Sequence, residues 1–516
     1  MKQISTAIPA FRRLSAAILL LAAANVINAA TYRLTIKDTR YQTVTGFGAA
    51  CCDGAMCPFA NDTMPAHLLY GPQSAIGLNI MRMEISPNFE GDVKVPEWNN
   101  WDSPYDWNGS LPSAKIVKKR GGIVFGTPWS PPGEYKTNGT AQGGNAEDQG
   151  YQEGRLRKDC YAKFFPWLNT FLGWMKSHGV AVDAVSVQNE PDWWVNYSGC
   201  LYTPQEQLDL VKNYAHLLDR RTYPGVRLIS AEPLGFDPNY SNTLLNDQTA
   251  RQQVDIIAGH IYGHEPLGNM KASAQKAAQY GKEVWMTEHS STDNIGNRLP
   301  NWHEQLLFAE ELNECMLAGG TGYIYWYMRA HWAFVSTGES KYGSKNSKKN
   351  KLLPRAYVMS HFSKHVTGST RLGTSSAMES GKEAAMEFSA YIKGDSLIVM
   401  AIDTTDTGRD LKLKLPYKVR SGLHVLSTGN ETNELCQEQE IDIPESTENV
   451  TVSMPARSLN TYIFMIDNGD VAIEEQKVGR DLKPVAYYDM QGRRIEKPRG
   501  MYIETYADGS SRKVFK

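Results

Sequence analysis

The chain is poor in three features that would assign it to a common class. Its 516 residues carry a net charge of −2, so no global field favours nucleic acid or an acidic membrane as a partner. Its seven cysteines are too sparse for a disulfide scaffold and lack the CxxC pairs of zinc modules, although their pairing cannot be deduced from the sequence. They are Cys51, Cys52, Cys57, Cys160, Cys200, Cys315 and Cys436.

Long apolar runs are also scarce, and the one that stands out is at the N-terminus. Lys2, Arg12 and Arg13 precede the run LSAAILLLAAA, and small residues at 27–30 fit a cleavage site. The run is short for a membrane span, and no later segment has the length and apolar character of one. We therefore expect residues 1–30 to be a signal peptide, and the mature protein to be secreted, cell-surface or periplasmic.

Aromatic residues, in contrast, are plentiful, with 12 Trp and 26 Tyr. Their planar rings have a hydrophobic face and, in these two residue types, a polar group, which suits contact with sugar rings. Large barrels and sandwiches also bury many aromatics, so both uses are expected here.

Eight short apolar runs alternate with helical segments, which is typical of parallel strands covered by helices. Convincing helices include 158–178, a segment that begins at the capping residue Thr203, and 304–317. This pattern predicts an α/β fold, a (β/α)8 TIM barrel over residues 44–365. An open doubly wound sheet is the alternative, but no GxGxxG motif follows the first run. The eight runs are 44–50, 78–85, 122–129, 183–190, 226–232, 254–260, 283–289 and 321–327.

From residue 366 the pattern changes to alternating apolar and polar residues separated by turn signals, which predicts a β-sandwich over 366–467. The segment 31–43 reads as a strand of the same sandwich. Residues 468–516 form a tail that resembles sorting or attachment segments of exported bacterial proteins. The expected sandwich strands are 384–394, 395–403, 411–416, 424–429, 450–455 and 459–466.

Catalytic groups of such barrels come from the C-terminal ends of different strands. Two glutamates, Glu190 and Glu288, end the fourth and seventh runs, each after a buried strand. Two carboxylates flanking one bond are what glycosidic cleavage needs, one to protonate the leaving oxygen and one to attack carbon or activate water. Other residues near the strand ends are Arg82, Glu84, Thr127, Trp129, Asn189, Glu232, His260, Tyr262, His289 and Trp326.

Several motifs, in this order along the chain, resemble glycoside hydrolase family 30, and most closely its bacterial endo-xylanase and glucuronoxylanase branch. They are GFGAA, PWSPPGEYKTNG, VSVQNEPDW, HIYG, VWMTEH, YWYMR, YVMSHFSKHV and PARSLNTYIF. The resemblance spans residue 31 to about residue 467, which covers the predicted barrel and sandwich.

This resemblance implies a retaining double displacement, with Glu190 as acid/base and Glu288 as nucleophile. The substrate-binding positions that it implies are Asn189, Trp129, Tyr262, Trp326, Arg82, His260 and Trp332. Arg82 and Tyr262 would keep Glu288 ionised, and Asn189 would donate to the sugar's 2-hydroxyl. Core packing is the other interpretation for the two tryptophans Trp129 and Trp326, and an ion pair with Glu84 is the other interpretation for Arg82.

The sequence departs from the family where glucuronate-dependent members bind a uronic acid branch. The family's arginine and tyrosine after the eighth strand align with Ala330 and Trp332, and its tyrosine and serine after the nucleophile align with Ser290 and Asp293. Alanine cannot bind a carboxylate as an arginine fork does. Arg329, one position away, is a possible substitute, and the lysine-rich run 341–351 reads as a solvated insertion. We therefore expect an endo-β-1,4-xylanase that does not depend on glucuronic acid branches.

Three alternatives remain open from the sequence. The backbone sugar could be another β-glycan such as a glucan or galactan, or the enzyme could still require glucuronoxylan. A non-catalytic carbohydrate-binding protein would explain the aromatics but has no need of a second carboxylate. A metal-dependent hydrolase could use His260, His264, Glu288 and His289, but the HxxxH spacing needs a helix where a strand is predicted. We expect no cofactor, no metal and no nucleic-acid partner, a polysaccharide substrate, and a monomer.

Overall fold

The fold is that of a computed structural model of the full chain. It describes residues 31–51, 62–87, 107–143, 154–195, 197–290, 300–329, 333–338, 348–380, 386–467, 484–489, 493–496, 501–505 and 511–515. The predicted signal peptide therefore lies outside the described residues.

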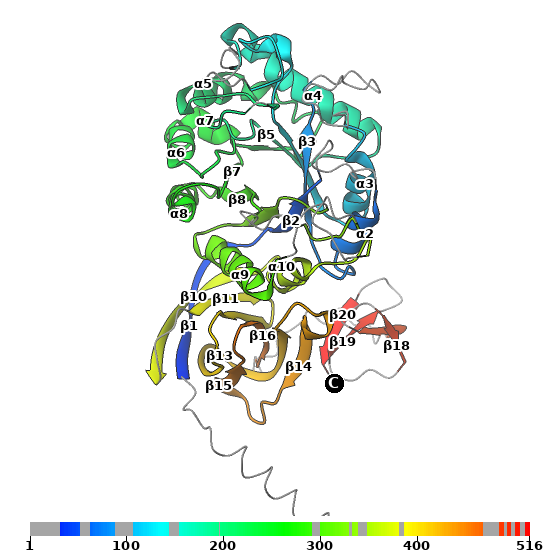
Figure 1. The fold of residues 1–516 in the computed structure, drawn as a ribbon, viewed down its shortest axis with the longest axis vertical. Helices are drawn as coiled ribbons and strands as arrows, with labels where there is room; N and C mark the ends of the chain where they lie inside the picture. Colours follow the sequence, from blue (N-terminus) through cyan, green and yellow to red (C-terminus); the bar gives the residue numbers. More distant parts are fainter. Residues whose placement is uncertain are drawn as a thin grey trace, which may run out of the picture.

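A closed parallel barrel of eight strands forms the larger part of the molecule (Figure 1). Every predicted run contains one of its strands, so the predicted (β/α)8 barrel is confirmed. The second glycine of the first strand lies against its neighbour so closely that a Cβ there would be 1.9 Å from the Ile80 carbonyl oxygen. The strands are β2 (Gly46–Ala50), β3 (Ile80–Ile85), β4 (Ile123–Pro128), β5 (Ala184–Ser186), β6 (Arg227–Ile229), β7 (Ile256–His260), β8 (Glu283–Glu288) and β9 (Gly322–Tyr325).

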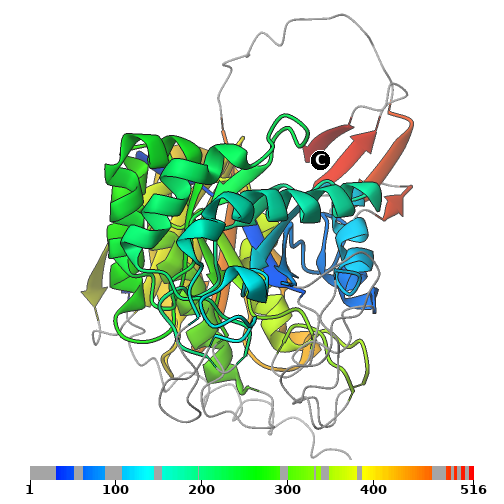
Figure 2. The same cartoon turned by 90° about the horizontal axis from the view of Figure 1, so that it is seen from above.

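Helices surround the barrel, as Figures 1 and 2 show. The predicted Thr203 cap belongs to a full capping box with Glu206, and a second box joins Asn301 to Glu304 at the start of α9. The helices are α2 (Met64–Leu69), α3 (Leu111–Lys119), α4 (Tyr161–Ser177), α5 (Pro204–Tyr214), α6 (Pro238–Asn246), α7 (Gln248–Gln253), α8 (Pro266–Ala278), α9 (Trp302–Leu317) and α10 (Pro354–His365).

The barrel interior changes from apolar to polar along the strands. Its apolar layer includes Ile80, Phe125 and Ala258, which pack in one buried cluster. Because side chains alternate between the two faces of a strand, the residues two positions further on point to the same interior. Those residues include Arg82, Thr127 and His260, all buried and polar. The C-terminal rim of the barrel is therefore a closely packed polar layer supported by an apolar one.

The remaining long strands form a β-rich side domain beside α9 and α10 (Figure 1). As predicted, the segment before the barrel belongs to it, because β1 pairs antiparallel with β10 and parallel with β13. Alternate residues of these strands form a separate hydrophobic core. The strands are β1 (Thr31–Thr43), β10 (Thr370–Ser380), β11 (Met386–Lys393), β12 (Ser396–Asp403), β13 (Arg409–Ser427), β14 (Gln437–Ile441), β15 (Thr447–Met454) and β16 (Ser458–Ile466).

The sequence analysis was wrong about one pair of strands. Segments 411–416 and 424–429 were expected as two strands, but β13 runs through most of both, ending at Ser427. Its first half pairs with β1 and β15, and its second half pairs with β14 and β16. Pro416 lies where pairing with β15 is interrupted between Lys414 and Val419, so the ladder needs no N–H from it. The predicted set also omitted β10 and β14.

Buried polar contacts fix the side domain to the barrel. The His361 ring of α10 lies 2.8 Å from the Thr461 hydroxyl and 2.9 Å from the Ser427 hydroxyl. Burial lowers the pKa of His361 well below its ordinary value, so this ring is neutral and joins the two units through hydrogen bonds rather than charge.

The predicted tail contains a small antiparallel sheet, drawn in red in Figure 1. It consists of β17 (Ala486–Asp489), β18 (Arg494–Ile495), β19 (Met501–Thr505) and β20 (Ser511–Phe515). Among the helices within the described ranges, none is long and apolar enough to cross a membrane.

Candidate active site

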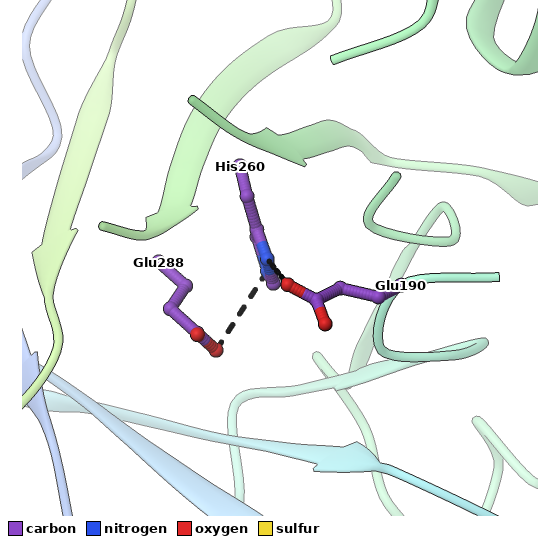
Figure 3. A group of neighbouring side chains, drawn as sticks. All are labelled: Glu190, His260 and Glu288. Carbon is purple, nitrogen blue, oxygen red and sulfur yellow. Dashed lines mark hydrogen bonds and ion pairs between the residues drawn. The ribbon is translucent and has the colours of Figure 1, made fainter. Parts of the chain in front are cut away.

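Glu190 and Glu288 meet at the polar rim of the barrel, together with His260 (Figure 3). One carboxylate oxygen of each glutamate and one ring nitrogen of the histidine lie within 4.8 Å of one another. Both glutamates are 8% exposed, so they are largely shielded from water but still reachable. The two acids that the sequence predicts for one bond therefore share one site.

The backbone presents Glu190 in an unusual conformation. Its φ is +42°, a left-handed value that a non-glycine residue adopts only when the surrounding structure enforces it. The enforcing contacts come from both neighbouring strands' ends. The Asn189 N–H donates to the Pro128 carbonyl at 2.9 Å, and the Glu190 N–H donates to the Glu232 carbonyl at 2.9 Å. Such strain is typical of functional sites and turns the carboxyl to the rim.

Glu288 lies at the end of β8 and accepts hydrogen bonds from two of the predicted partners. Arg82 Nη1 is 2.5 Å from its Oε2, and the Tyr262 hydroxyl is 3.3 Å from its Oε1. Burial raises the pKa of the Glu288 carboxyl, and the charge of Glu190 acts in the same direction, whereas His260 and Arg82 oppose the rise. Burial and Glu288 raise the pKa of Tyr262 well above its ordinary value, so its hydroxyl remains a donor.

His260 ends β7 and lies between the two acids. Its Nδ1 is 3.0 Å from Glu190 Oε1, and its Nε2 is 4.0 Å from Glu288 Oε2. Burial alone would lower the pKa of this ring, but Glu288, Glu190 and Glu232 outweigh burial and raise the pKa to about 9. The ring is therefore a cation at neutral pH and donates from both nitrogens. The resemblance implied a substrate-binding role for His260, whereas these contacts show that it also orients Glu190.

Glu232 is named among the strand-end residues in the sequence analysis, but it was not predicted to belong to the site. It follows β6, is fully buried, and accepts hydrogen bonds from Arg82, Thr127 and His260. Although burial opposes ionisation, the Arg82 and His260 cations lower the pKa of Glu232 to about 2, so it is ionised. The sequence did contain a signal for Glu232, because this glutamate ends the fifth apolar run and so belongs to the same rim as the other strand ends. The sequence does not say which of several rim glutamates touches substrate and which one serves its neighbours.

Two of the predicted tryptophans, Trp129 and Trp326, line the site. Their ring centroids are 5.8 Å apart, and the Arg82 guanidinium lies 4.6 Å from the Trp129 ring centroid. Trp129 is 7% exposed, so core packing accounts for most of its surface. The Asn189 side-chain oxygen accepts from Arg82 Nη2 at 2.7 Å, which leaves its NH2 group as the donor.

The positions that mark the departure from glucuronate binding fall largely outside the described residues. Ala330, Trp332 and Asp293 are among those not described, so the predicted role of Trp332 stays a prediction. Ser290 is described and is 9% exposed. Arg329, the possible substitute, is 1% exposed, and its Nη1 lies 2.7 Å from the Asp62 carboxylate. Its guanidinium is thus engaged by a carboxylate of the chain itself.

The metal alternative can be weighed from the chemistry of its candidate ligands. His264 is exposed, and His289 Nδ1 lies 2.8 Å from Glu311, so these two do not join the cluster of Glu190, His260 and Glu288. Both ring nitrogens of His260 already face carboxylates, Glu190 at 3.0 Å and Glu232 at 3.3 Å. The four ligands that the sequence suggested for a metal therefore do not come together in one site.

A sequence profile of the glycosyl hydrolase family 30 TIM-barrel domain matches residues 97–315. The chain is 28% identical over 399 residues to the glucuronoxylanase XynC of Bacillus subtilis, covering 76% of this chain and 82% of that protein. It is 27% identical over 328 residues to the endo-1,6-beta-D-glucanase neg1 of Aspergillus fumigatus, covering 54% and 64% respectively.

Among solved structures, the chain is similar to the family 30 subfamily 8 xylanase Xyn30A of Clostridium acetobutylicum. The TM-score is 0.65 and the sequence identity is 30%, with 85% of this chain and all of that chain covered.

Proposed function

Since the chain belongs to glycoside hydrolase family 30, we propose that it hydrolyses the backbone of a β-linked polysaccharide with retention of configuration. Glu190 is the acid/base and Glu288 is the nucleophile of this proposal. The observation that carries it is the approach of the two acids, with oxygens within 4.8 Å. A carboxyl separation of about 5–5.5 Å serves a covalent double displacement, whereas inversion needs a wider gap for water.

In the first step, a Glu288 oxygen attacks the anomeric carbon as the glycosidic C–O bond breaks and the Glu190 proton moves to the leaving oxygen. In the second step, Glu190 takes a proton from water, whose oxygen attacks the same carbon and releases the Glu288 carboxylate. Arg82 and Tyr262 hold Glu288 in place throughout, and the Asn189 amide is placed to donate to a sugar hydroxyl.

For the substrate, we propose a xylan that needs no glucuronic acid branch. The similarity to two xylanases supports the backbone sugar. The replacement of the branch-binding arginine by Ala330 supports independence from the branch. The engagement of Arg329 by Asp62 adds to this support, because a guanidinium already paired with a carboxylate is a poor second site for another.

A panel of purified glycans tests this proposal. We expect comparable activity on glucuronoxylan and on unbranched or arabinose-decorated xylan, with oligosaccharide products seen by chromatography. Strong activity on glucuronoxylan alone would contradict branch independence. β-1,6-Glucan belongs in the panel because a relative is named as an endo-1,6-glucanase, and preference for it would replace xylan as the substrate.

Two exposed tryptophans beside the acid give a second test of polymer binding. Trp193 and Trp194 are 51% and 45% exposed. Trp193 closes the turn that begins at Glu190, because its N–H donates to the Glu190 carbonyl, and Trp194 comes directly after it. A sugar stacked there would lie on the leaving-group side, because the acid protonates the leaving oxygen. We expect Trp193→Ala to raise KM for polysaccharide roughly fivefold, the equivalent of about 1 kcal/mol.

The matched control for this change is Tyr41→Ala, because Tyr41 is 52% exposed but lies on β1 in the side domain. It should leave KM unchanged. Equal effects of the two substitutions, or none from Trp193→Ala, would remove this platform from the substrate path.

We also propose that the protein is exported, on the basis of the charged and apolar segments of residues 1–30. N-terminal sequencing of the protein recovered outside the cytoplasm should begin near residue 30. An intact first segment on that protein would contradict the proposal.

A further inference from the structure

Glu232 occupies a position that links the two halves of the proposed catalytic pair. A single oxygen, Oε2, lies 2.9 Å from Arg82 Nη2 and 3.3 Å from His260 Nε2. Arg82 also donates a hydrogen bond to the nucleophile Glu288, and the other ring nitrogen of His260 contacts the acid Glu190. The other oxygen accepts from the Thr127 hydroxyl at 2.8 Å. One fully buried carboxylate thus holds the partner of each acid.

The charges of the buried site show why such a carboxylate is needed. Arg82 and His260 bring two positive charges, and an ionised Glu288 balances one of them. If Glu232 were neutral, Arg82 and His260 would share Glu288 as their counter-ion, although His260 lies 4.0 Å from it. With Glu232 ionised, both cations have a buried carboxylate close by, Arg82 at 2.9 Å and His260 at 3.3 Å. Burial strengthens these interactions, because the dielectric screening of water is weak there.

We propose that Glu232 is a positioning residue for this reaction, a shared counter-ion that orients Arg82 and His260 and, through them, Glu288 and Glu190. The inference rests on the proposed roles of Glu190 and Glu288. Glu232 itself does not touch the reacting sugar in this scheme, and it acts through the two cations.

The effect of removing the charge has a definite sign. Among the described residues, the acids and the tyrosine that face His260 are Glu190 and Asp192 from the segment after β5, Glu232 from the segment after β6, Tyr262 beyond β7, and Glu288 from β8. The Arg82 cation of β3 shares one oxygen of Glu232 and one of Glu288 with this ring. Glu232 is one of the acids that raise the pKa of this ring to about 9. Glu232→Gln should therefore lower the pKa of His260 toward its ordinary 6.5.

The experiment compares pH profiles of kcat/KM on the polysaccharide for the wild type and Glu232→Gln. We expect the alkaline limb of the profile to move to lower pH by about one unit or more, because His260 loses its proton at lower pH in this variant. We also expect a fall in kcat and little change in KM. Glu232→Asp keeps the charge and should restore the wild-type limb. Equal loss at every pH, with the limb unmoved in both variants, would mean that Glu232 only packs the barrel.

Glu283 provides a matched control at the opposite end of the barrel. It also accepts from an arginine, a threonine hydroxyl and a ring N–H, namely Arg227 at 2.6 Å, Thr45 at 2.6 Å and Trp285 at 2.9 Å. Glu283→Gln removes a similar network from the start of β8, so its pH profile should match the wild type. A shift of the limb in this variant too would attribute the effect to general loosening of the barrel.

Histidine NMR separates this inference from the proposed function. In the wild-type protein at neutral pH, we expect the His260 ring to be protonated on both nitrogens and to titrate near pH 9. This measurement needs no substrate, so it remains informative if the glycan panel shows no hydrolysis or if Glu232→Gln does not fold. A neutral His260 ring at pH 7 would overturn the inference.

Discussion

Glu288→Gly should reduce hydrolysis of the natural polysaccharide on the order of 10⁴-fold or more, because it removes the carboxylate that forms the covalent bond to the sugar. The substitution also removes the acceptor for Arg82 and Tyr262, and it leaves a space beside the anomeric carbon. A small anion such as azide should enter that space and attack an activated aryl glycoside. Because the anion arrives from the nucleophile's side, the product should be the inverted glycosyl azide, identifiable by proton NMR.

The same substitution separates a nucleophile from a general base. If Glu288 activated water instead, the wild-type enzyme would release the inverted sugar, which NMR of the first product would reveal. Circular dichroism and glycan binding by the variant show whether the fold and the cleft survive. Retained hydrolysis in Glu288→Gly would end the assignment of this residue as nucleophile.

Glu190→Ala should lower kcat/KM on polysaccharide by about 10²- to 10⁴-fold, the usual contribution of a general acid or base. The loss should be much smaller for an aryl glycoside whose leaving group departs without a proton. With that substrate the second step becomes limiting, because the variant lacks the base that activates water. The covalent intermediate should then accumulate and appear by mass spectrometry, with the sugar attached to Glu288.

Azide also tests Glu190, with the opposite stereochemical result. In Glu190→Ala the anion attacks the sugar already bound to Glu288, so the azide product should have retained configuration. The control is Glu283→Gln. The Glu283 carboxylate pairs with Arg227 away from the site, so its removal should not affect either step. A loss that is equal for good and poor leaving groups would contradict an acid role for Glu190.

The arrangement of the strands could largely be predicted from the sequence, and so could the residue types at their ends. Near-continuous apolar runs indicate strands covered on both faces, and a parallel barrel places all their C-terminal ends on one rim. For that reason Glu190 and Glu288 could be paired before any distance was known. The alternation of apolar and polar residues predicted strand boundaries less reliably. It divided β13 into two strands near Pro416, where the extended backbone in fact continues. Pairing partners from elsewhere in the chain decided that case.

The sequence by itself determined which acids stand at the rim, because alternation along each strand fixes which side chains face the interior. Only the tertiary structure decided how far apart these acids lie and which side chains form hydrogen bonds and ion pairs with them. Glu232 meets residues 150 and 28 positions away in Arg82 and His260, and Arg329 is engaged by Asp62 from a distant segment. Such contacts depend on the register of the closed barrel and on charges brought together from several strands, and no short stretch of the chain contains them.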